Sequence, residues 1–215
     1  MPERYPGYDV LNKRNSPSWN DQTRRVIDER LAIDPDRHLF FTEEEWLTIG
    51  AVCSRIVPQS VARPRPVPLA AMIDQKLFAG HGDGYRYAEL PPIREAWRRG
   101  LAALDAEAQS RHHRRFHDLA PLEQDAILTA VQDGSVREPA WRDLPPRSFF
   151  TKRVLHDIVA AYYSHPTSWN EIGFGGPASP RGYVRMNFDR RDPWEASEAK
   201  PGRERQARRE NARVG

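Results

Sequence analysis

Cysteine is almost absent from the sequence, which has one such residue, Cys53, among 215. A single thiol excludes an intramolecular disulfide framework, a zinc knuckle and the Cys-x-x-Cys-His attachment of covalent haem. Cys53 falls on the apolar face of an expected helix, where a free cysteine behaves as a small hydrophobe. We expect a buried structural thiol, with an intermolecular disulfide as the alternative.

Long hydrophobic runs are also absent. The mean hydropathy is −0.77, and no run approaches the roughly 18 apolar residues that a spanning helix needs. We therefore expect no direct membrane insertion. The first 31 residues are polar and lack the apolar core of an export signal, and the pair Arg24-Arg25 is not followed by a twin-arginine pattern. The sequence predicts a cytoplasmic protein, periplasmic only if a partner carries it across.

The chain has little excess charge, with a formal net charge of +3. Arginines alternate with acids throughout, whereas a nucleic-acid-binding protein concentrates basic residues on one folded face. We therefore expect no nucleic-acid partner, and the arginine-rich segment 197–215 is the only region that supports the alternative.

Familiar catalytic motifs are missing too. The glycine turn at 81–85 lacks the strand and helix that flank a phosphate-binding loop. No Gly-x-Ser-x-Gly or His-Glu-x-x-His is present. His156 and Asp157 are neighbours on an expected helix and point about 100° apart, so we expect no ordered pair between them.

Helical periodicity dominates what is present, and it predicts an all-α fold of about five to six helices. Thr42 and Glu45 form a capping box at the first strong helix, which Pro58 ends. Gly100 lies on the inward face of the third helix and suggests close approach by another helix. The expected helices are 42–57, 69–79, 92–109, 121–132 and 147–164, with a short amphipathic one possible at 22–31.

The helix at 147–164 is apolar on more than one face, with Phe150, Val154 and Ile158 on one side and Val159 and Tyr163 adding further apolar surface. That pattern is typical of a helix surrounded by others. Around it we expect three regions: an extended N-terminal arm (1–38), a helical domain (39–189) and a charged, disordered tail (190–215).

Three histidines invite a metal hypothesis. His113 and His117 are four residues apart and could share a helix face, and His112 adjoins them. Metal sites usually need three or four protein ligands, and the nearby arginines would repel a cation. A stand-alone metal- or histidine-dependent enzyme using His112, His113, His117 or His156 is therefore the alternative hypothesis.

The segment after Ser164 combines glycines and prolines with large apolar side chains. Glycine permits sharp bends and proline stiffens the backbone, so such a loop is ordered before it binds. A loop of this kind should pack against something, either the protein's own helices or another protein.

Four stretches give the sequence a family resemblance. They are FFTEEEWLTIGAVCSRIVPQ, DLAPLEQDAIL, SFFTKRVLHDIVAAYYSHP and SWNEIGFGGP, which occur in this order between residues 39 and 184. Together they resemble the small subunit (subunit 3, or gamma subunit) of gluconate 2-dehydrogenase. Many members of that family begin with a twin-arginine signal, which this sequence lacks, so an export-escort role is less expected than stabilisation or assembly.

The resemblance implies a mostly helical, non-catalytic accessory subunit without a cofactor of its own. It also implies a large flavoprotein partner of the glucose-methanol-choline type that carries FAD, and a possible cytochrome c subunit. We expect the partner to bind the loop after Ser164, with packing on the chain's own helices as the alternative. The expected interface residues are Trp169, Asn170, Ile172, Gly173, Phe174, Gly176, Pro177, Arg181 and Tyr183.

Overall fold

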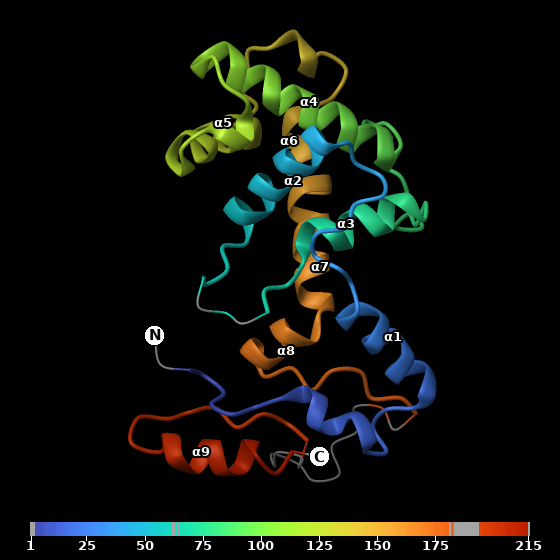
Figure 1. Ribbon diagram of the computed structural model, residues 1–215, viewed down its shortest axis with the longest axis vertical. Coiled ribbons are helices and arrows are strands. Elements are labelled where there is room, and N and C mark those ends of the chain that lie inside the picture. The colour runs from blue at the N-terminus through green and yellow to red at the C-terminus, as the bar shows by residue number, and fades with distance from the viewer. Residues whose placement is uncertain (1–2, 62, 64, 181, 183–193, 215) are drawn as a thin grey trace. The chain divides into compact units, whose positions relative to one another are not determined.

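The computed structural model describes residues 3–61, 63, 65–180, 182 and 194–214 (Figure 1). The chain divides into two compact units, which we call the helical unit (residues 34–162) and the terminal unit (residues 1–33 and 163–215). Regular structure in the described ranges is helical apart from one isolated bridge between Trp19 and Ser179. The prediction of an all-α fold is confirmed.

The helical unit contains the long helices predicted from the sequence, and the observed ends differ from the predicted ones by at most a few residues. Residues 146–164 form one continuous helical run with a π-helical section in its middle (Figure 1). The elements are α2 (Glu43–Ile56), α3 (Leu69–Phe78), α4 (Ile93–His112), η2 (Phe116–Asp118), α5 (Pro121–Asp133), η3 (Pro139–Trp141), α6 (Pro146–Phe149), η4 (Phe150–Leu155) and α7 (His156–Ser164).

Local polar contacts fix the start of α2. The Thr42 hydroxyl accepts from the Glu45 amide at 3.3 Å, and the Glu45 carboxylate accepts from the Thr42 amide at 2.9 Å, so the predicted capping box is present. Buried Asp74 of α3 accepts hydrogen bonds from the backbone amides of residues 39, 40 and 41. These bonds satisfy the otherwise unpaired amides of the loop that leads into α2.

A close helix contact in this unit is made at Gly100 of α4. A Cβ atom on Gly100 would overlap the ring of Phe149, which is fully buried. Trp97 and Trp141 surround the same ring, with centroids 5.8 and 5.9 Å away. The predicted close approach at Gly100 is confirmed, and it is an aromatic ring that fills the space.

The run from Pro146 to Ser164 supplies much of the core, as expected, and Phe149, Phe150, Val154 and Ile158 are buried. It is not surrounded along its whole length. Val159 and Tyr163 keep 39% and 48% of their surface exposed, so the expectation of a fully enclosed helix fails near its C-terminal end.

The terminal unit joins segments that are far apart in the sequence. Its elements are η1 (Val10–Asn15), α1 (Asp21–Leu31), α8 (Pro166–Ile172) and α9 (Glu204–Asn211), together with the last residues of α7. Ser179 pairs with the arm through two backbone hydrogen bonds of 2.8 Å. The Ser179 amide donates to the Ser18 carbonyl, and the Asn20 amide donates to the Ser179 carbonyl. The arm is thus an ordered part of this unit.

Helix α8 lies where the sequence suggested irregular backbone. Pro166 occupies its first turn, the His165 side chain accepts from the Thr167 amide, and Gly173 ends it in the left-handed conformation with φ 68°. Proline at the start and glycine just past the end are ordinary helix boundaries. The helix was missed because it spans only seven residues.

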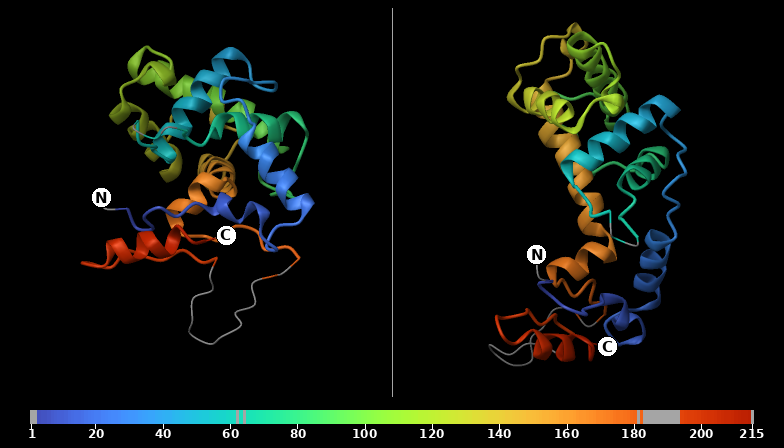
Figure 2. Two further views of the ribbon diagram at one scale, coloured as in Figure 1. Left: turned by 60° about the horizontal axis from the view of Figure 1, so that its bottom comes forward. Right: turned by 60° about the vertical axis from the view of Figure 1, so that its left-hand side comes forward.

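The sequence also predicted a disordered tail, and the structure differs there. Helix α9 buries Ala207 and Asn211, and Val214 just beyond it is buried as well. Asn211 accepts from the Ser197 amide at 2.6 Å, and its side-chain nitrogen donates to the Pro6 carbonyl at 3.1 Å. Figure 2 shows the tail beside the N-terminal arm. The many charged residues of this segment predicted disorder, but α9 needs to bury only a narrow face, formed by Ala207 and Asn211.

Within the described ranges, no helix is both long enough and apolar enough to cross a membrane.

Candidate functional site

The first candidate site is the segment predicted as a partner interface, and its anchor is Trp169 of α8. This side chain is 3% exposed, and its Nε1 donates to the Tyr163 carbonyl at 2.6 Å. It belongs to a small core of the terminal unit with Tyr8, Val10 and Trp19. Trp169 therefore holds the segment in place and offers little surface to a partner.

Three more of the predicted interface residues also face the arm. Asn170 accepts from the Val10 amide at 2.8 Å. A Cβ on Gly173 would lie 2.6 Å from the Tyr5 ring, and one on Gly176 would lie 3.1 Å from a Val10 methyl carbon. Both glycines have positive φ, so their backbone conformation and their close packing exclude larger residues.

Ile172 and Phe174 behave differently, because they remain 45% and 40% exposed. The Phe174 ring packs edge-to-face on Trp169 at 5.7 Å, so it is held in place while one side faces outward. Pro177 is half-buried. Arg181 and Tyr183 lie outside the described residues. Two apolar side chains of this segment thus remain partly exposed.

The second candidate site is a cluster of charged side chains inside the helical unit. Asp83, in the loop after α3, pairs with Lys76 at 2.6 Å and with Arg153 at 2.9 Å. Asp157 of α7 accepts from Trp97 Nε1 at 2.7 Å and lies 3.1 Å from Lys76 Nζ. These four charges join α3, the loop after it, and the run that contains η4 and α7.

The pKa values of two members follow from this arrangement. Burial raises the pKa of Asp83, but hydrogen bonds from Lys76 and Arg153 outweigh that effect and leave its pKa below the ordinary value. Burial likewise lowers the pKa of Lys76, and the hydrogen bond to Asp83 together with the charge of Asp157 reverses it, so the net shift is upward. Both groups are therefore held in their charged forms at neutral pH.

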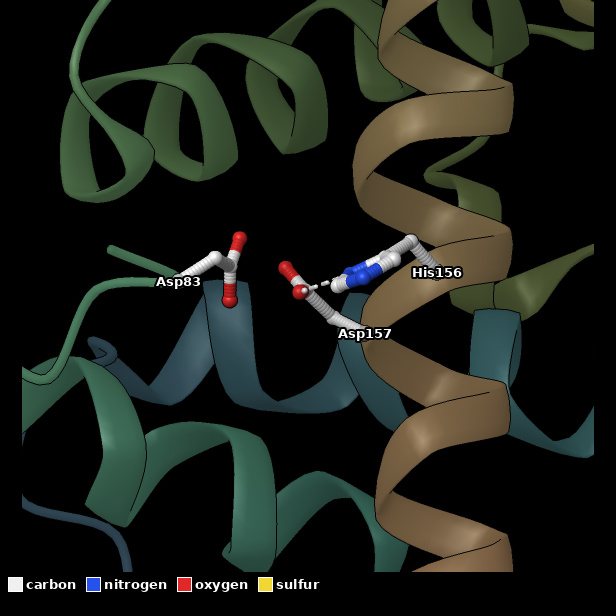
Figure 3. A group of neighbouring side chains, drawn as sticks. All are labelled: Asp83, His156 and Asp157. Atoms are coloured by element: carbon white, nitrogen blue, oxygen red, sulfur yellow. Dashed lines mark hydrogen bonds and ion pairs between the residues drawn. The ribbon is translucent and has the colours of Figure 1, made fainter. Parts of the chain in front are cut away.

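His156 corrects one prediction. Its Nδ1 lies 3.1 Å from Oδ1 of Asp157, so the neighbours do form a pair (Figure 3). The angle of about 100° fixes only the directions of the two Cα–Cβ bonds. Rotation about χ1 and χ2 still brings the imidazole and the carboxylate together. The expectation that adjacent helical residues cannot pair was wrong because it ignored side-chain length.

Asp83, His156 and Asp157 also place one potential ligand atom each within 4.8 Å of one another (Figure 3). The chemistry of this set does not favour a metal ion. Both carboxylates already bind Lys76 and Arg153, and two fixed positive charges would repel a divalent cation. The cluster is better suited to holding the loop that carries Asp83.

The histidines considered earlier do not form a site together. Helix α4 ends at His112, and His113 is in the left-handed conformation, so His113 and His117 do not share the face expected of them. His112 lies 3.4 Å from Glu123, whereas His117 lies 3.5 Å from the buried Thr48 hydroxyl. Cys53 is buried, and burial raises the pKa of its thiol far above the ordinary value.

Sequence reasoning missed Lys76, Asp83 and Arg153. They are distant in the sequence, and neither the glycine turn that contains Asp83 nor the family stretch that contains Arg153 carries a signal that would group these residues with Lys76.

Comparison with known proteins identifies the family. The family model described as gluconate 2-dehydrogenase subunit 3 matches residues 43–176, which include α2 to α8 and end at the glycine packed on Val10. Comparison with curated proteins gives no significant match, and neither does comparison with solved structures. The match covers more than half of the chain. The chain belongs to the gluconate 2-dehydrogenase subunit 3 family.

Proposed function

We propose that this protein is a non-catalytic accessory subunit that binds and stabilises the large flavin-dependent subunit of a sugar or polyol dehydrogenase. The family match carries the proposal, because the family is named for subunit 3 of gluconate 2-dehydrogenase. In this proposal FAD belongs to a partner of the glucose-methanol-choline type, and a cytochrome c subunit is a further possible component. We place the complex in the cytoplasm unless the partner exports it.

The exposed apolar residues of the α8 segment support a specific docking surface, which we define as Ile172 and Phe174. Large apolar side chains that are held rigidly and remain partly exposed are typical of interaction sites. Here Trp169 and the arm fix the backbone below them, so little order is lost on binding.

The test is purification from the native host. The affinity tag should be placed at the N-terminal end, because Glu3 there is exposed, whereas Val214 near the C-terminal end is buried. We expect a larger yellow protein in stoichiometric amount, identified by its flavin absorbance. Purification of the chain alone, colourless and folded, would contradict the proposal.

The docking surface is tested by the double variant Ile172→Glu/Phe174→Glu. We expect at least a tenfold loss of bound flavoprotein with unchanged helical content, because two charges replace the apolar contact. The matched control is Leu122→Glu on α5, where Leu122 is 82% exposed in the helical unit. Loss of the partner in the control but not in the double variant would place the interface on α5.

A further inference from the structure

A pocket of about 200 Å³ opens beside the charged cluster, between the loop after α3 and the start of α4. Its walls are mostly apolar and come from residues 90–93 and from the rings of Tyr85 and Tyr87. The tyrosine rings meet edge-to-face at 5.3 Å, and their hydroxyl groups lie 3.3 Å apart. A pocket of this size suits a ligand of few heavy atoms, since typical ligand sites are larger, about 300–1,000 Å³.

Arg153 gives this apolar pocket a strong hydrogen-bond donor. Its side chain is 5% exposed and lines the pocket, with the guanidinium carbon 5.5 Å from the centre of the Tyr87 ring. Within the described residues, its hydrogen bond to Asp83 at 2.9 Å and its ion pair with Asp157 at 3.7 Å both use Nη1. Nε and Nη2 therefore keep donors for a further acceptor, in the fork geometry that binds carboxylates in pairs.

The backbone around Arg153 is unusual. It lies in η4, a π-helical section of six residues. π-helical turns are rare and often occur at functional sites. Here the π-helical section carries Arg153, whose guanidinium is buried and lines the pocket. An arginine that only formed an ion pair at the surface would not need to be buried at a pocket wall.

The charges around the pocket leave room for an anion. Lys76 and Arg153 are balanced by Asp83, which also lines the pocket, and by Asp157. The exposed Arg86 also lines the pocket and makes no ion pair within the described part of the chain. In addition, α4 begins at this pocket and has no side-chain cap, so its dipole favours a negative group there.

From these observations we propose that the pocket binds a carboxylate carried on a small apolar body. The apolar walls and the tyrosine rings would hold the body, and the free edge of Arg153, with Arg86, would hold the carboxylate. A phosphate fits less well because the walls would strip water from a second negative charge with few donors to replace it. The same chemistry is offered by a free monocarboxylate and by a glutamate of a bound protein segment.

The experiment is a titration of the full chain with benzoate, followed by NMR or calorimetry. Benzyl alcohol serves as the matched neutral ligand and inorganic phosphate as the anion without an apolar body. We expect benzoate to bind at least tenfold more tightly than either. A short glutamate-containing peptide forms the second arm: tighter binding of the peptide than of benzoate indicates a protein segment, and the reverse indicates a free metabolite.

Three variants locate the site. Ile93→Trp fills the pocket without changing any charge and should abolish benzoate binding. Arg86→Gln should weaken it about tenfold, and Arg153→Lys should weaken it at least as much, because lysine keeps the charge but loses the fork. Arg142→Gln is the control and should bind as the unmodified chain does, because Arg142 is exposed and does not line the pocket.

Equal binding of benzoate and benzyl alcohol would overturn the proposal, as would no binding of either. Unchanged benzoate binding in Ile93→Trp, with that variant folded by circular dichroism, would overturn it too. If Ile93→Trp does not fold, Arg86→Gln still tests the proposal, because Arg86 is exposed and its replacement leaves the core intact. Unchanged benzoate binding in that variant would then count against the proposal.

Discussion

The two units of this protein are built from contacts of different range. In the helical unit the core comes from helices whose apolar spacing is visible in the sequence, such as α4 and α5. In the terminal unit the core joins Tyr8 and Trp19 to Trp169 and Val214, and no periodic pattern links these residues. The first kind of core can be recognised one helix at a time. The second exists only after distant segments have met.

The long-range contacts of the terminal unit also affect its free energy of opening. The hydrogen bond from Asn211 to the Pro6 carbonyl closes a separation of 205 residues, and that from the Val10 amide to Asn170 closes 160. Closing long loops costs entropy that local helical contacts do not. We therefore expect the terminal unit to open at lower free energy than the helical unit.

The largest effect should come from Trp169→Ala. Removing a buried tryptophan costs about 3–5 kcal/mol, and we expect this loss to appear as opening of the terminal unit alone. Hydrogen exchange should rise in residues 5–20, 165–180 and 204–211, while α2 to α5 keep their protection. Phe174→Ala is the matched control, because the ring is 40% exposed and should cost under about 1 kcal/mol.

A global loss of protection in Trp169→Ala would contradict this division. It would mean that the two units unfold together and that the terminal unit is part of one cooperative structure.

Gly100→Ala should act on the other unit. The added methyl group would overlap the buried Phe149 ring, and overpacking of this kind costs about 3 kcal/mol. Gly50→Ala on α2 is the control, since a Cβ there meets nothing within 4 Å and alanine favours a helix by about 0.5–1 kcal/mol. The midpoint of thermal unfolding should fall for Gly100→Ala and rise for Gly50→Ala. Equal midpoints in the two variants would show that the ring moves aside freely.

Asp83→Asn should have a smaller, pH-dependent effect of about 2 kcal/mol at pH 7, since it removes one partner of two largely buried ion pairs. The pKa of Asp83 is lowered in the folded state, so its contribution is present above the unfolded pKa of about 3.9 and disappears as pH falls through the lower folded value. Denaturant unfolding at pH 7 and in steps down to pH 3 measures this. A stability difference that does not shrink with acidification would show that the carboxylate charge is not responsible.

The comparison also explains what could be predicted from the sequence. The capping box at Thr42 and the close approach at Gly100 depend on neighbours in the chain or on a single helical face, and both were predicted. Helix α8 could have been found from Pro166 and Gly173, which are ordinary boundary signals. Its shortness and the glycines after it directed attention to loop structure.

Other features could not be predicted by any local rule. Asp83 meets Arg153 across 70 residues, and Ser179 meets the arm across 159. The outward position of Phe174 and the inward position of Trp169 depend on where the arm lies, and the arm's own sequence shows no strong period. Family resemblance therefore indicated which segment to examine, and only the fold divided it into anchor residues and exposed residues.

The joined segments of the terminal unit also set the order in which the protein can be completed during synthesis. Domains fold as they leave the ribosome, with earlier segments first. Residues 34–162 can fold once α7 has been made. The arm has been synthesised before them, yet Tyr8, Val10 and Trp19 lack their full core until Val214 has been added. Until residue 214 has been made, the nascent chain therefore carries an apolar arm whose core is incomplete.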